Sequence, residues 1–324
     1  MNKQIEIKIK YFGKLTVIDL SIIIVNFNTC ELLKNCLDSV YLHTKDLNFE
    51  IIVVDNASSD NSLLTVKEKF PHVKLIENSK NVGFARANNQ GIEISTGKYI
   101  LLLNSDTLLI NNVLPNLVAL LEKKQNFGIV GPQVLNEDKS LQFSFGNFPG
   151  IQAELERTFL LENRLTRKRM LNDKRIFAQD AFPVNWVSGC CLMIRRNVYE
   201  KIGGLDEQFF LFNEEADWCL RALKAGWPTC YDPGSQIIHY GGKSTQKNYY
   251  TFVLSRYHSR LLFIKKHYSP LVQFLFRCIV VFALYIRIIL TLFTFFNAKE
   301  RKQRNSAYKY ALLLHLGLKQ KVAF

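Results

Sequence analysis

The sequence lacks the glycine motifs of two common nucleotide-binding folds. It contains no G-x-G-x-x-G segment after its first apolar run and no G-x-x-x-x-G-K-[ST] segment anywhere. The first motif marks a dinucleotide-binding Rossmann unit, and the second marks a P-loop. Glycine (16) and proline (8) are also scarce in the 324 residues, while 48% of the residues are hydrophobic. This composition excludes a collagenous or disordered chain and predicts a folded core.

Cysteine pairs and internal repeats are missing as well. The seven cysteines include no C-x-x-C pair, and an odd number cannot close a complete disulfide framework. We therefore expect reduced, buried thiols and no zinc site. No spacing recurs at 20–50 residues, which argues against a solenoid or propeller. Residues 1–17 lack a continuous apolar stretch, so we expect a short strand or hairpin there rather than a secretory signal.

The positive charge is confined to one end of the chain. Residues 1–242 hold 27 Lys and Arg against 27 Asp and Glu, whereas residues 243–324 hold 15 Lys and Arg against Glu300 alone. The whole net charge of +14 therefore lies in the last quarter. A neutral body with a basic, phenylalanine-rich tail does not have the pattern of a basic nucleic-acid-binding domain, so no nucleic-acid partner is expected.

Apolar runs and helical spacings alternate along the first 131 residues. Strands are predicted at 20–27, 49–54, 73–76, 99–103 and 128–130. Helices are predicted between them, at 31–43, 62–70, 84–94 and 112–123. Apolar strands that alternate with helices indicate an α/β fold with a mostly parallel central sheet and flanking helices on both faces.

The regular alternation ends after Pro132. Residues 151–180 are polar and irregular, with a basic cluster at Arg164, Arg167, Lys168 and Arg169, and are interpreted as a mobile or acceptor-side insertion. Farther on, the pattern predicts a strand at 184–194, a helix at 214–225 and a strand at 236–239, and then only helices.

Polar side chains follow the ends of the predicted strands. Asparagine and aspartate at one such position would be explained by turn formation or helix capping. Their recurrence at several ends of one sheet favours a ligand site instead, because ligands of open α/β sheets bind beyond the carboxyl ends of the strands. The residues concerned are Asn26, Asn28, Asp55, Asn56, Asn104, Asp106 and His239.

Seven segments in order resemble family 2 glycosyltransferases of the GT-A fold, in particular the bacterial rhamnosyltransferase-like branch. They are SIIIVNFN (21–28), EIIVVDNASSD (50–60), NVGFARANNQG (81–91), YILLLNSD (99–106), WVSGCCLMIRR (186–196), FFLFNEEADWCLRALKAGW (209–227) and IIHYGGKS (237–244). The resemblance implies a domain over residues 18–245, with a nucleotide-sugar half (18–131) and an acceptor half (132–245).

The resemblance implies roles for the donor-side residues. Asp55 would contact the base or ribose of a nucleoside diphosphate-sugar, with Asn26, Asn28 and Asn56 lining the same pocket. Arg86 would offer its guanidinium, beside a helix N-terminus, to the pyrophosphate or to an acidic residue of the metal site.

The resemblance also implies a divalent cation, Mn²⁺ or Mg²⁺. Asn104-Ser105-Asp106 takes the place of the family's D-x-D motif, with asparagine at its first position. Asp106 would supply the charged ligand and His239 a second one, and Asn104 would add at most a neutral carbonyl.

The catalytic base implied by the family motif is Glu215. Asn213 would cap the helix that starts there, and the helix dipole would favour the ionised carboxylate. Trp186, Gly189 and Glu214 would lie on the acceptor side. Asp217, also placed on that side, lies about 200° around the helix from Glu215 and forms an i,i+4 pair with Arg221 that favours a structural role.

The resemblance thus implies an inverting transferase that moves a sugar, plausibly rhamnose, from a dTDP- or UDP-sugar to a saccharide or lipid-linked saccharide in surface polysaccharide synthesis. Two alternatives remain: a degenerate, non-catalytic transferase that serves as an assembly partner, and a nucleotidyltransferase. The departures Asn104 and Glu215 leave the first alternative open, whereas VNFNTCEL lacks the glycine-rich basic loop that the second normally has.

The basic tail, residues 246–324, is expected to be helical and to associate with membranes through 271–304. Residues 271–298 are long enough to cross a bilayer, but Arg277 and Arg287 interrupt them and both flanks are basic. A helix lying in the interface, with its basic side chains reaching headgroups, is favoured over a span or a soluble core helix. The expected location is the cytoplasmic face of the bacterial cell membrane.

Overall fold

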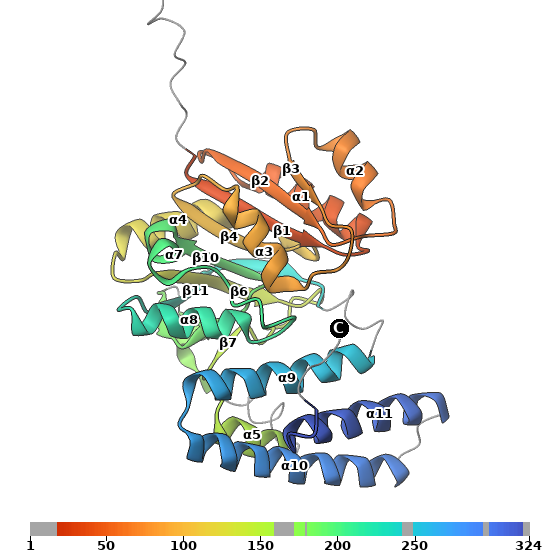
Figure 1. The fold of residues 1–324 in the computed structure, drawn as a ribbon. Helices are drawn as coiled ribbons and strands as arrows, with labels where there is room; N and C mark the ends of the chain where they lie inside the picture. The colour runs from red at the N-terminus through yellow and green to blue at the C-terminus, as the bar shows by residue number, and fades with distance from the viewer. Residues whose placement is uncertain (1–17, 159–171, 179, 242–248, 294–297, 320–324) are drawn as a thin grey trace, which may run out of the picture.

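The computed structural model describes residues 18–158, 172–178, 180–241, 249–293 and 298–319. A twisted sheet with helices on both faces forms one part of the molecule, and a layer of helices lies beneath it (Figure 1). The hairpin expected in residues 1–17 and the basic cluster at 164–169 lie outside the described residues.

The central sheet has nine strands, in the order β3-β2-β1-β4-β10-β6-β11-β5, with β8 paired to β11. Their bounds are β1 Leu20–Asn26, β2 Phe49–Asp55, β3 Lys74–Glu77, β4 Tyr99–Asn104, β5 Thr107–Leu109, β6 Ile129–Leu135, β8 Phe182–Val184, β10 Cys191–Arg195 and β11 Thr229–His239. A separate antiparallel pair joins β7 (Phe145–Gly146) to β9 (Trp186–Val187).

The sheet is mostly parallel, as predicted. β1, β2, β3, β4, β6 and β11 run in one direction, and β5, β8 and β10 run against them. The strands are apolar on both faces because helices cover both. Within β1, Ile22 and Ile24 pack into one core and Ile23 into the other.

Helices of the two faces follow the strands in the chain. α1 (Cys30–His43), α2 (Ser62–Lys69) and α4 (Val113–Lys123) bury residues in one core. α3 (Phe84–Glu93), α7 (Arg196–Ile202) and α8 (Glu214–Lys224) bury theirs in the other. All seven cysteines are free; five of them are buried, whereas Cys30 is half-buried and Cys278 is exposed.

The second half departs from the expected elements in three places. The single strand predicted at 184–194 is wrong: the chain forms β8, β9 and β10, with a turn at 188–190 between the last two. Ile151–Thr158, expected to be irregular, forms helix α5, and a 3-10 turn follows at Lys174–Phe177. Gly189 lies in the turn between β9 and β10. The continuous apolar sequence predicts one strand, but its two parts belong to different sheets.

The C-terminal region is helical, as expected, and consists of α9 (Tyr249–His267), α10 (Pro270–Phe293) and α11 (Ala298–His315). These helices share a small core around Leu254, Ile264, Val280 and Leu284. α5 packs on α10, although it comes from the 132–245 half. A second cluster, formed by Phe209, Ala216 and Phe263, joins α9 to α8.

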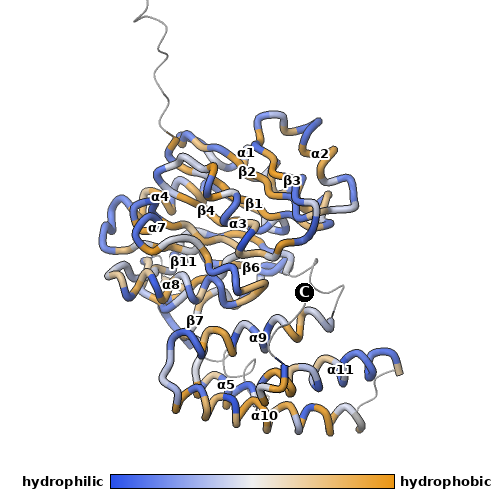
Figure 2. Tube along the Cα trace, in the orientation of Figure 1, coloured by the Kyte–Doolittle hydropathy of each residue, from blue (hydrophilic) through white to orange (hydrophobic). Residues whose placement is uncertain are grey.

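Helix α10 is hydrophobic along most of its length (Figure 2), and several of its apolar side chains are exposed. Phe274, Phe282 and Phe293 are 63%, 56% and 77% exposed. In the described part of the chain, Pro270–Thr291 is the one helical stretch long and apolar enough to cross a membrane, and 28% of it is buried.

The two arginines of α10 face the protein. Arg277 donates to the carbonyl of His315 (3.3 Å), and Arg287 donates to the carbonyl of Arg157 (2.9 Å). The expectation that these side chains reach outward is therefore wrong. Each guanidinium satisfies carbonyl groups at the end of a neighbouring helix, which leaves the outer face of α10 without charge.

Candidate active site

The donor side of the predicted site is a buried hydrogen-bond network at the ends of β1 and β2. Asn26 and Asp55 are in register on these strands, and Asn26 Nδ2 donates to Asp55 Oδ1 (3.0 Å). The other oxygen of Asp55 accepts from the Ser58 backbone N–H (2.8 Å). Asn26 is fully buried and Asp55 is 1% exposed. The sheet register thus brings these two residues together, and their amide and carboxylate hold the following loop.

Asn28 and Asn56 also hold loops. Asn28 Oδ1 accepts from the Ser59 backbone N–H (2.7 Å), and Asn28 has a left-handed backbone (φ 54°). Asn56 Oδ1 accepts from the Val82 backbone N–H (3.1 Å), while its Nδ2 donates to Asn81 Oδ1 (3.0 Å). Asn56 therefore connects β2 to the segment that leads into α3.

Arg86 lies near the start of α3 and is largely exposed. Within the described part of the chain its ion pair is with Glu207, at 3.8 Å, rather than with a residue of the predicted metal site. Gly83 precedes the helix with φ 88°, and a Cβ there would fall 2.8 Å from the Phe210 ring. The Phe84 N–H donates to the Phe210 carbonyl (2.9 Å), so the first turn of α3 is tied to the loop before α8.

The ends of β4 and β11 bring together the three predicted metal-site residues. His239 Nε2 lies 3.1 Å from Asp106 Oδ1 and 3.4 Å from Asn104 Nδ2. Gln142 orients the imidazole: its Nε2 donates to Asn136 Oδ1 (2.8 Å) and to the His239 carbonyl (3.1 Å), so its Oε1 accepts from His239 Nδ1 (2.6 Å). The Nε2 lone pair of a neutral imidazole then faces Asp106.

This donor set fits a divalent cation that is shared with a ligand. No group of three or more His, Cys, Asp or Glu side chains suited to a metal occurs among the described residues. One carboxylate, one oriented imidazole and one amide leave coordination positions for phosphate oxygens and water, as Mg²⁺ and Mn²⁺ sites that bind substrate phosphates commonly do.

Glu214 and Glu215 begin α8, and Glu214 is buried while Glu215 is half-buried. Glu214 is 4% exposed, and each carboxyl has a buried Oε2 without a hydrogen-bond partner among the described residues. Burial raises the pKa of Glu215 to about 7, although backbone N–H groups of the first turn oppose the shift. Burial and the neighbouring charge of Glu215 raise the pKa of Glu214 well above its usual range. Burial thus outweighs the helix-terminus effect expected from the sequence.

The expected side-chain cap of α8 is absent. Asn213 occupies the N-cap position with a left-handed backbone (φ 64°), and its side chain makes no capping bond. Phe212 before it is also left-handed (φ 73°). Two consecutive non-glycine residues with a left-handed backbone cost conformational free energy, and such strain is commonly found at functional sites.

Cys190 lies beside the predicted metal site, and its carbonyl accepts from the Asn104 backbone N–H (2.9 Å). Burial raises the pKa of its thiol to about 12, and the nearby charges of Asp106 and Glu215 contribute to the rise. At Gly189, a Cβ would fall 3.6 Å from Glu215 Cβ and 3.5 Å from the Phe84 ring. The turn after β9 therefore places Gly189 beside Glu215, with Asp106 close by.

Trp186 and Asp217 have structural partners. The Trp186 indole donates to the Asn147 carbonyl (2.8 Å), and its ring meets Phe143 edge-on at 5.6 Å. Asp217 is fully buried and accepts from Arg221 Nε (2.8 Å), which forms the predicted i,i+4 pair. Asp217 also lies 2.9 Å from Lys266 Nζ and 2.7 Å from His267 Nε2 of α9. Asp217 thus ties α8 to α9.

Two site residues carry no signal in the sequence. Gln142 is separated from His239 by 97 positions, and only the pairing of β6 with β11 brings them together. Ser58 is separated from Asn26 by 32 positions, and it accepts a hydrogen bond from Asn26 Nδ2 (3.1 Å). A glutamine or serine in a loop has no characteristic spacing, so the sequence alone does not mark Gln142 or Ser58 as site residues.

Comparison with a solved structure identifies the fold. A mannosyltransferase from Pyrobaculum calidifontis, described in complex with GDP-Man and Mn²⁺, superposes with a TM-score of 0.57 over 94% of this chain and 89% of that one, at 16% sequence identity. This likeness is one of fold. With its mostly parallel sheet and its helices on both faces, the chain has the architecture of a GT-A glycosyltransferase.

Sequence comparison identifies the family. The sequence model of glycosyl transferase family 2 matches residues 21–203, and the chain belongs to this family. An N-acetylglucosaminyl-diphospho-decaprenol L-rhamnosyltransferase of Mycobacterium tuberculosis is 25% identical over 266 residues, which are 77% of this chain and 85% of the relative. The rhamnosyltransferase WbbL of Escherichia coli is 27% identical over 229 residues, which are 68% and 82%. The rhamnosyltransferase-like resemblance is confirmed, and the protein is a glycosyltransferase.

Proposed function

We propose that this chain is an inverting glycosyltransferase that moves a sugar from a nucleoside diphosphate-sugar to a saccharide or lipid-linked saccharide acceptor in surface polysaccharide synthesis. The donor is a dTDP- or UDP-sugar, with rhamnose as the transferred sugar. The rhamnosyltransferases among the relatives support this choice. The observation that carries the proposal is the position of Glu215, half-buried beside Gly189. The next residue, Cys190, accepts through its carbonyl from the Asn104 backbone N–H (2.9 Å), so Glu215 begins its helix near the predicted metal site.

Glu215 acts as the general base. A carboxyl with a pKa of about 7 is ionised in part at neutral pH, and its basicity is far greater than that of an exposed glutamate. It takes the proton of an acceptor hydroxyl while that oxygen attacks the anomeric carbon opposite the departing diphosphate. A single displacement of this kind inverts the anomeric configuration.

Asp106 and His239, with the side-chain carbonyl of Asn104, would hold a divalent cation at the donor diphosphate. When bound, the cation supplies positive charge against the charge that builds on the leaving phosphate. Gln142 keeps the Nε2 of His239 turned toward Asp106. Asp55, Asn26, Asn28 and Asn56 shape the nucleotide pocket, with Arg86 at its rim. Trp186, Gly189 and Glu214 border the acceptor.

The helical layer holds the enzyme on the cytoplasmic face of the bacterial cell membrane. The outer face of α10 is apolar, its arginines face inward, and its inner face packs on α9 and α11. A transbilayer orientation would remove these contacts, so the arrangement favours a helix that lies in the interface.

The reaction is tested with a panel of dTDP- and UDP-sugars and saccharide acceptors, with nucleoside diphosphate release and product formation measured together. Release that depends on the acceptor is expected for one sugar class, and NMR of the product should show the anomeric configuration opposite to that of the donor. Retained configuration would exclude the single displacement, and no transfer with any pair would favour a non-catalytic assembly partner.

A further inference from the structure

The segment that leads into α8 is strained and lacks a side-chain cap. Phe212 and Asn213 both have left-handed backbones (φ 73° and 64°), and the Asn213 side chain makes no capping bond within the described residues. Non-glycine residues persist in this conformation only where their surroundings hold them. Glu215, the proposed base, stands two residues after Asn213. The position of its carboxylate therefore depends on the contacts that hold residues 211–213.

Helix α9 holds this segment through two direct contacts. Ser259 Oγ donates to the Leu211 carbonyl (2.8 Å), and Ser259 is only 1% exposed, so water does not compete for this bond. The Phe252 ring meets the Phe212 ring edge-on, with the ring centroids 5.4 Å apart. Both contacts come from a helix outside residues 21–203, which the family model matches.

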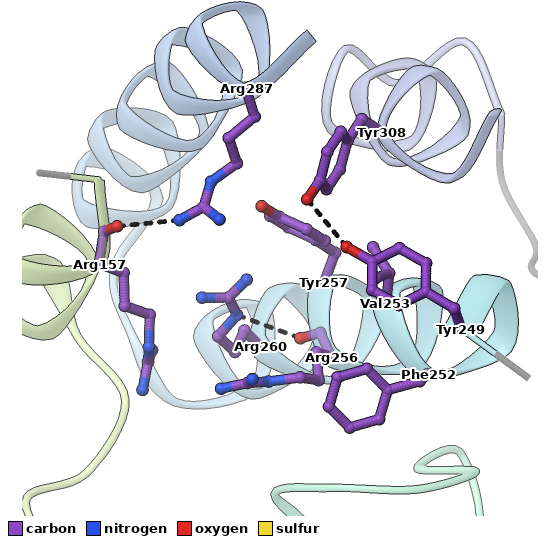
Figure 3. A pocket seen from close by; sticks show the side chains of 9 residues that line it. All are labelled: Arg157, Tyr249, Phe252, Val253, Arg256, Tyr257, Arg260, Arg287 and Tyr308. Atoms are coloured by element: carbon purple, nitrogen blue, oxygen red, sulfur yellow. Dashed lines mark hydrogen bonds between the residues drawn. The ribbon is translucent and has the colours of Figure 1, made fainter. Parts of the chain in front are cut away.

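Phe252 also lines a cavity within the helical layer. The cavity has a volume of about 140 Å³ and is lined by side chains of α5, α9, α10 and α11 (Figure 3). In Figure 3, Tyr257 extends from α9 toward Tyr308 and Arg287, whereas the Phe252 ring extends away from them. On the Tyr257 side, α9 shares a buried core with α10 and α11. Helix α9 thus has one face fixed in the helical layer and another against the segment before Glu215.

The contacts of α9 continue on both sides of the proposed base. Phe263 forms a buried cluster with Phe209, which precedes the strained segment, and with Ala216, which follows the base. The carboxylate of Asp217 lies 2.7 Å from His267 Nε2. The chain on either side of the base is therefore attached to the same helix.

A second buried serine of α9 shows that burial alone does not create such a bond. Ser255 lies about one turn before Ser259 and is fully buried, but its hydroxyl has no hydrogen-bond partner in the described part of the chain. The two serines share a helix and a buried environment, and they differ in the bond to the Leu211 carbonyl. Ser255 is therefore a matched reference for Ser259.

We propose that Ser259 is a positioning residue for Glu215. Its hydrogen bond holds the Leu211 carbonyl, and with it the strained segment, so that α8 starts where the Glu215 carboxylate meets the acceptor hydroxyl. The inference rests on the glycosyltransferase function proposed above, and it extends the catalytic machinery from the sheet to the helical layer. A displacement of about 1 Å can lower a rate by about 10²-fold, so one bond to this segment affects catalysis without touching substrate.

The first experiment compares two matched alanine variants. Ser259→Ala removes the bond to Leu211 and should lower kcat about 10–100-fold, while KM for the donor stays within about twofold. Ser255→Ala removes an unpartnered hydroxyl from the same helix and should leave kcat unchanged. Equal kcat in the two variants would overturn the proposal. If Ser259→Ala does not fold, Phe252→Leu takes its place, since it removes the ring contact with Phe212 and should lower kcat severalfold.

A double-mutant cycle separates positioning of the base from general support of the fold. In the Glu215→Gln background the base is already lost, so Ser259→Ala should change the residual rate by less than about twofold. An undiminished fall of kcat in that background would overturn the proposal, because Ser259 would then act on catalysis through another part of the site.

Hydrogen exchange of residues 209–217 gives a readout that needs no transfer reaction. These amides should exchange faster in Ser259→Ala than in wild type, whereas Ser255→Ala should match wild type. Unchanged exchange in Ser259→Ala would overturn the proposal, because the bond would not hold the segment. Wild type that transfers no sugar would overturn the proposed function together with this role, whereas normal transfer by both serine variants would overturn the positioning role alone.

Discussion

The sheet edge and the helical layer handle buried charge in opposite ways. At the carboxyl edge of the sheet the withdrawn charged groups are mainly acids, such as Asp55, Asp106 and Glu214, each 7% exposed or less. In the helical layer four arginines line a cavity, and the carboxylate of Glu154 lies close to two of them, Arg157 and Arg260. An acidic edge suits a cation and proton transfer. This contrast is partly visible in the sequence, because the whole excess of positive charge lies in residues 243–324.

Helix α8 belongs to both regions. Its first turn carries Glu214, Glu215 and Asp217. Each glutamate has one carboxyl oxygen without a hydrogen-bond partner among the described residues, whereas Asp217 is bonded to Arg221, Lys266 and His267. Burial opposes the charge of Asp217, but these bonds outweigh burial and lower its pKa to about 2. Burial without such partners raises the pKa of Glu215 to about 7. Partners, rather than residue type, decide which acid stays ionised.

The largest effect is expected at the proposed base. Glu215→Gln keeps the shape of the side chain but removes its basicity, so the transfer rate should fall by about 10²–10⁴-fold with donor binding preserved. Single-turnover kinetics and donor titration measure the two quantities. Glu200→Gln, at an exposed glutamate on α7, is the matched control and should be silent. Near-normal turnover in Glu215→Gln would move the base elsewhere.

The acid that joins the two regions should matter for folding. Asp217→Asn leaves Arg221, Lys266 and His267 without their shared carboxylate and should lower the free energy of unfolding by about 3–5 kcal/mol. Asp38→Asn breaks the exposed i,i+4 pair with Lys34, which water screens, and should lower the free energy of unfolding far less. Urea unfolding compares the two variants. Similar losses would show that the contact between α8 and α9 contributes little.

The same acid predicts a pH dependence. Because the folded state lowers the pKa of Asp217 from its usual value to about 2, its stabilisation is present above the unfolded pKa of about 4 and is lost as pH falls toward 2. Between pH 4 and 2, Asp217→Asn should therefore lose less stability than wild type. An identical loss in both proteins would contradict the assignment.

At the metal site, the largest change is expected from Asp106→Asn, which removes the charged ligand and should abolish cation-dependent donor binding. His239→Ala should weaken it less. Gln142→Ala should weaken it by about 10–100-fold, because the imidazole loses its orienting partner. Donor titration with and without EDTA measures each affinity. Wild-type affinity that is unchanged by EDTA would exclude the cation.

A change of pH should alter the transfer rate less than the substitutions above do. The rate should rise about tenfold per pH unit up to about 7 and then level off, because Glu215 must lose its proton to act as a base. The apparent pKa belongs to the Glu214–Glu215 pair, since the two carboxyls interact. A profile already flat at pH 5 would show that the base is not this buried pair.

The smallest effect is expected on the outer face of α10. Phe282→Ser removes one exposed aromatic side chain from the proposed membrane contact and should weaken binding to anionic vesicles by up to about tenfold, without loss of stability. Phe177→Ser, at a 64% exposed residue outside the helical layer, is the control. Point substitution is preferable to deletion of α10, which would uncover the core that it shares with α9. Equal vesicle binding by both variants would contradict the membrane contact.

The sequence by itself determined the elements and the family. Long apolar runs such as LSIIIVN and FEIIVVD predict buried strands. The polar residues at their ends meet because the carboxyl ends of parallel strands lie at one edge of the sheet. The ordered motifs also identified glycosyl transferase family 2. Local signals fail where one run serves two sheets, as at 184–194.

The tertiary structure decided what depends on distant partners. Burial rather than the helix terminus governs the pKa of Glu215, and strand pairing brings Gln142 to His239. Arg287 of α10 turns inward and donates to the carbonyl of Arg157, so its charge does not lie on the outer face of the helix. The packing of α5 on α10 brings Arg157 to the cavity that Arg287 also lines. Each of these outcomes depends on interactions between groups that are far apart in the chain, so no local pattern of residues predicts it.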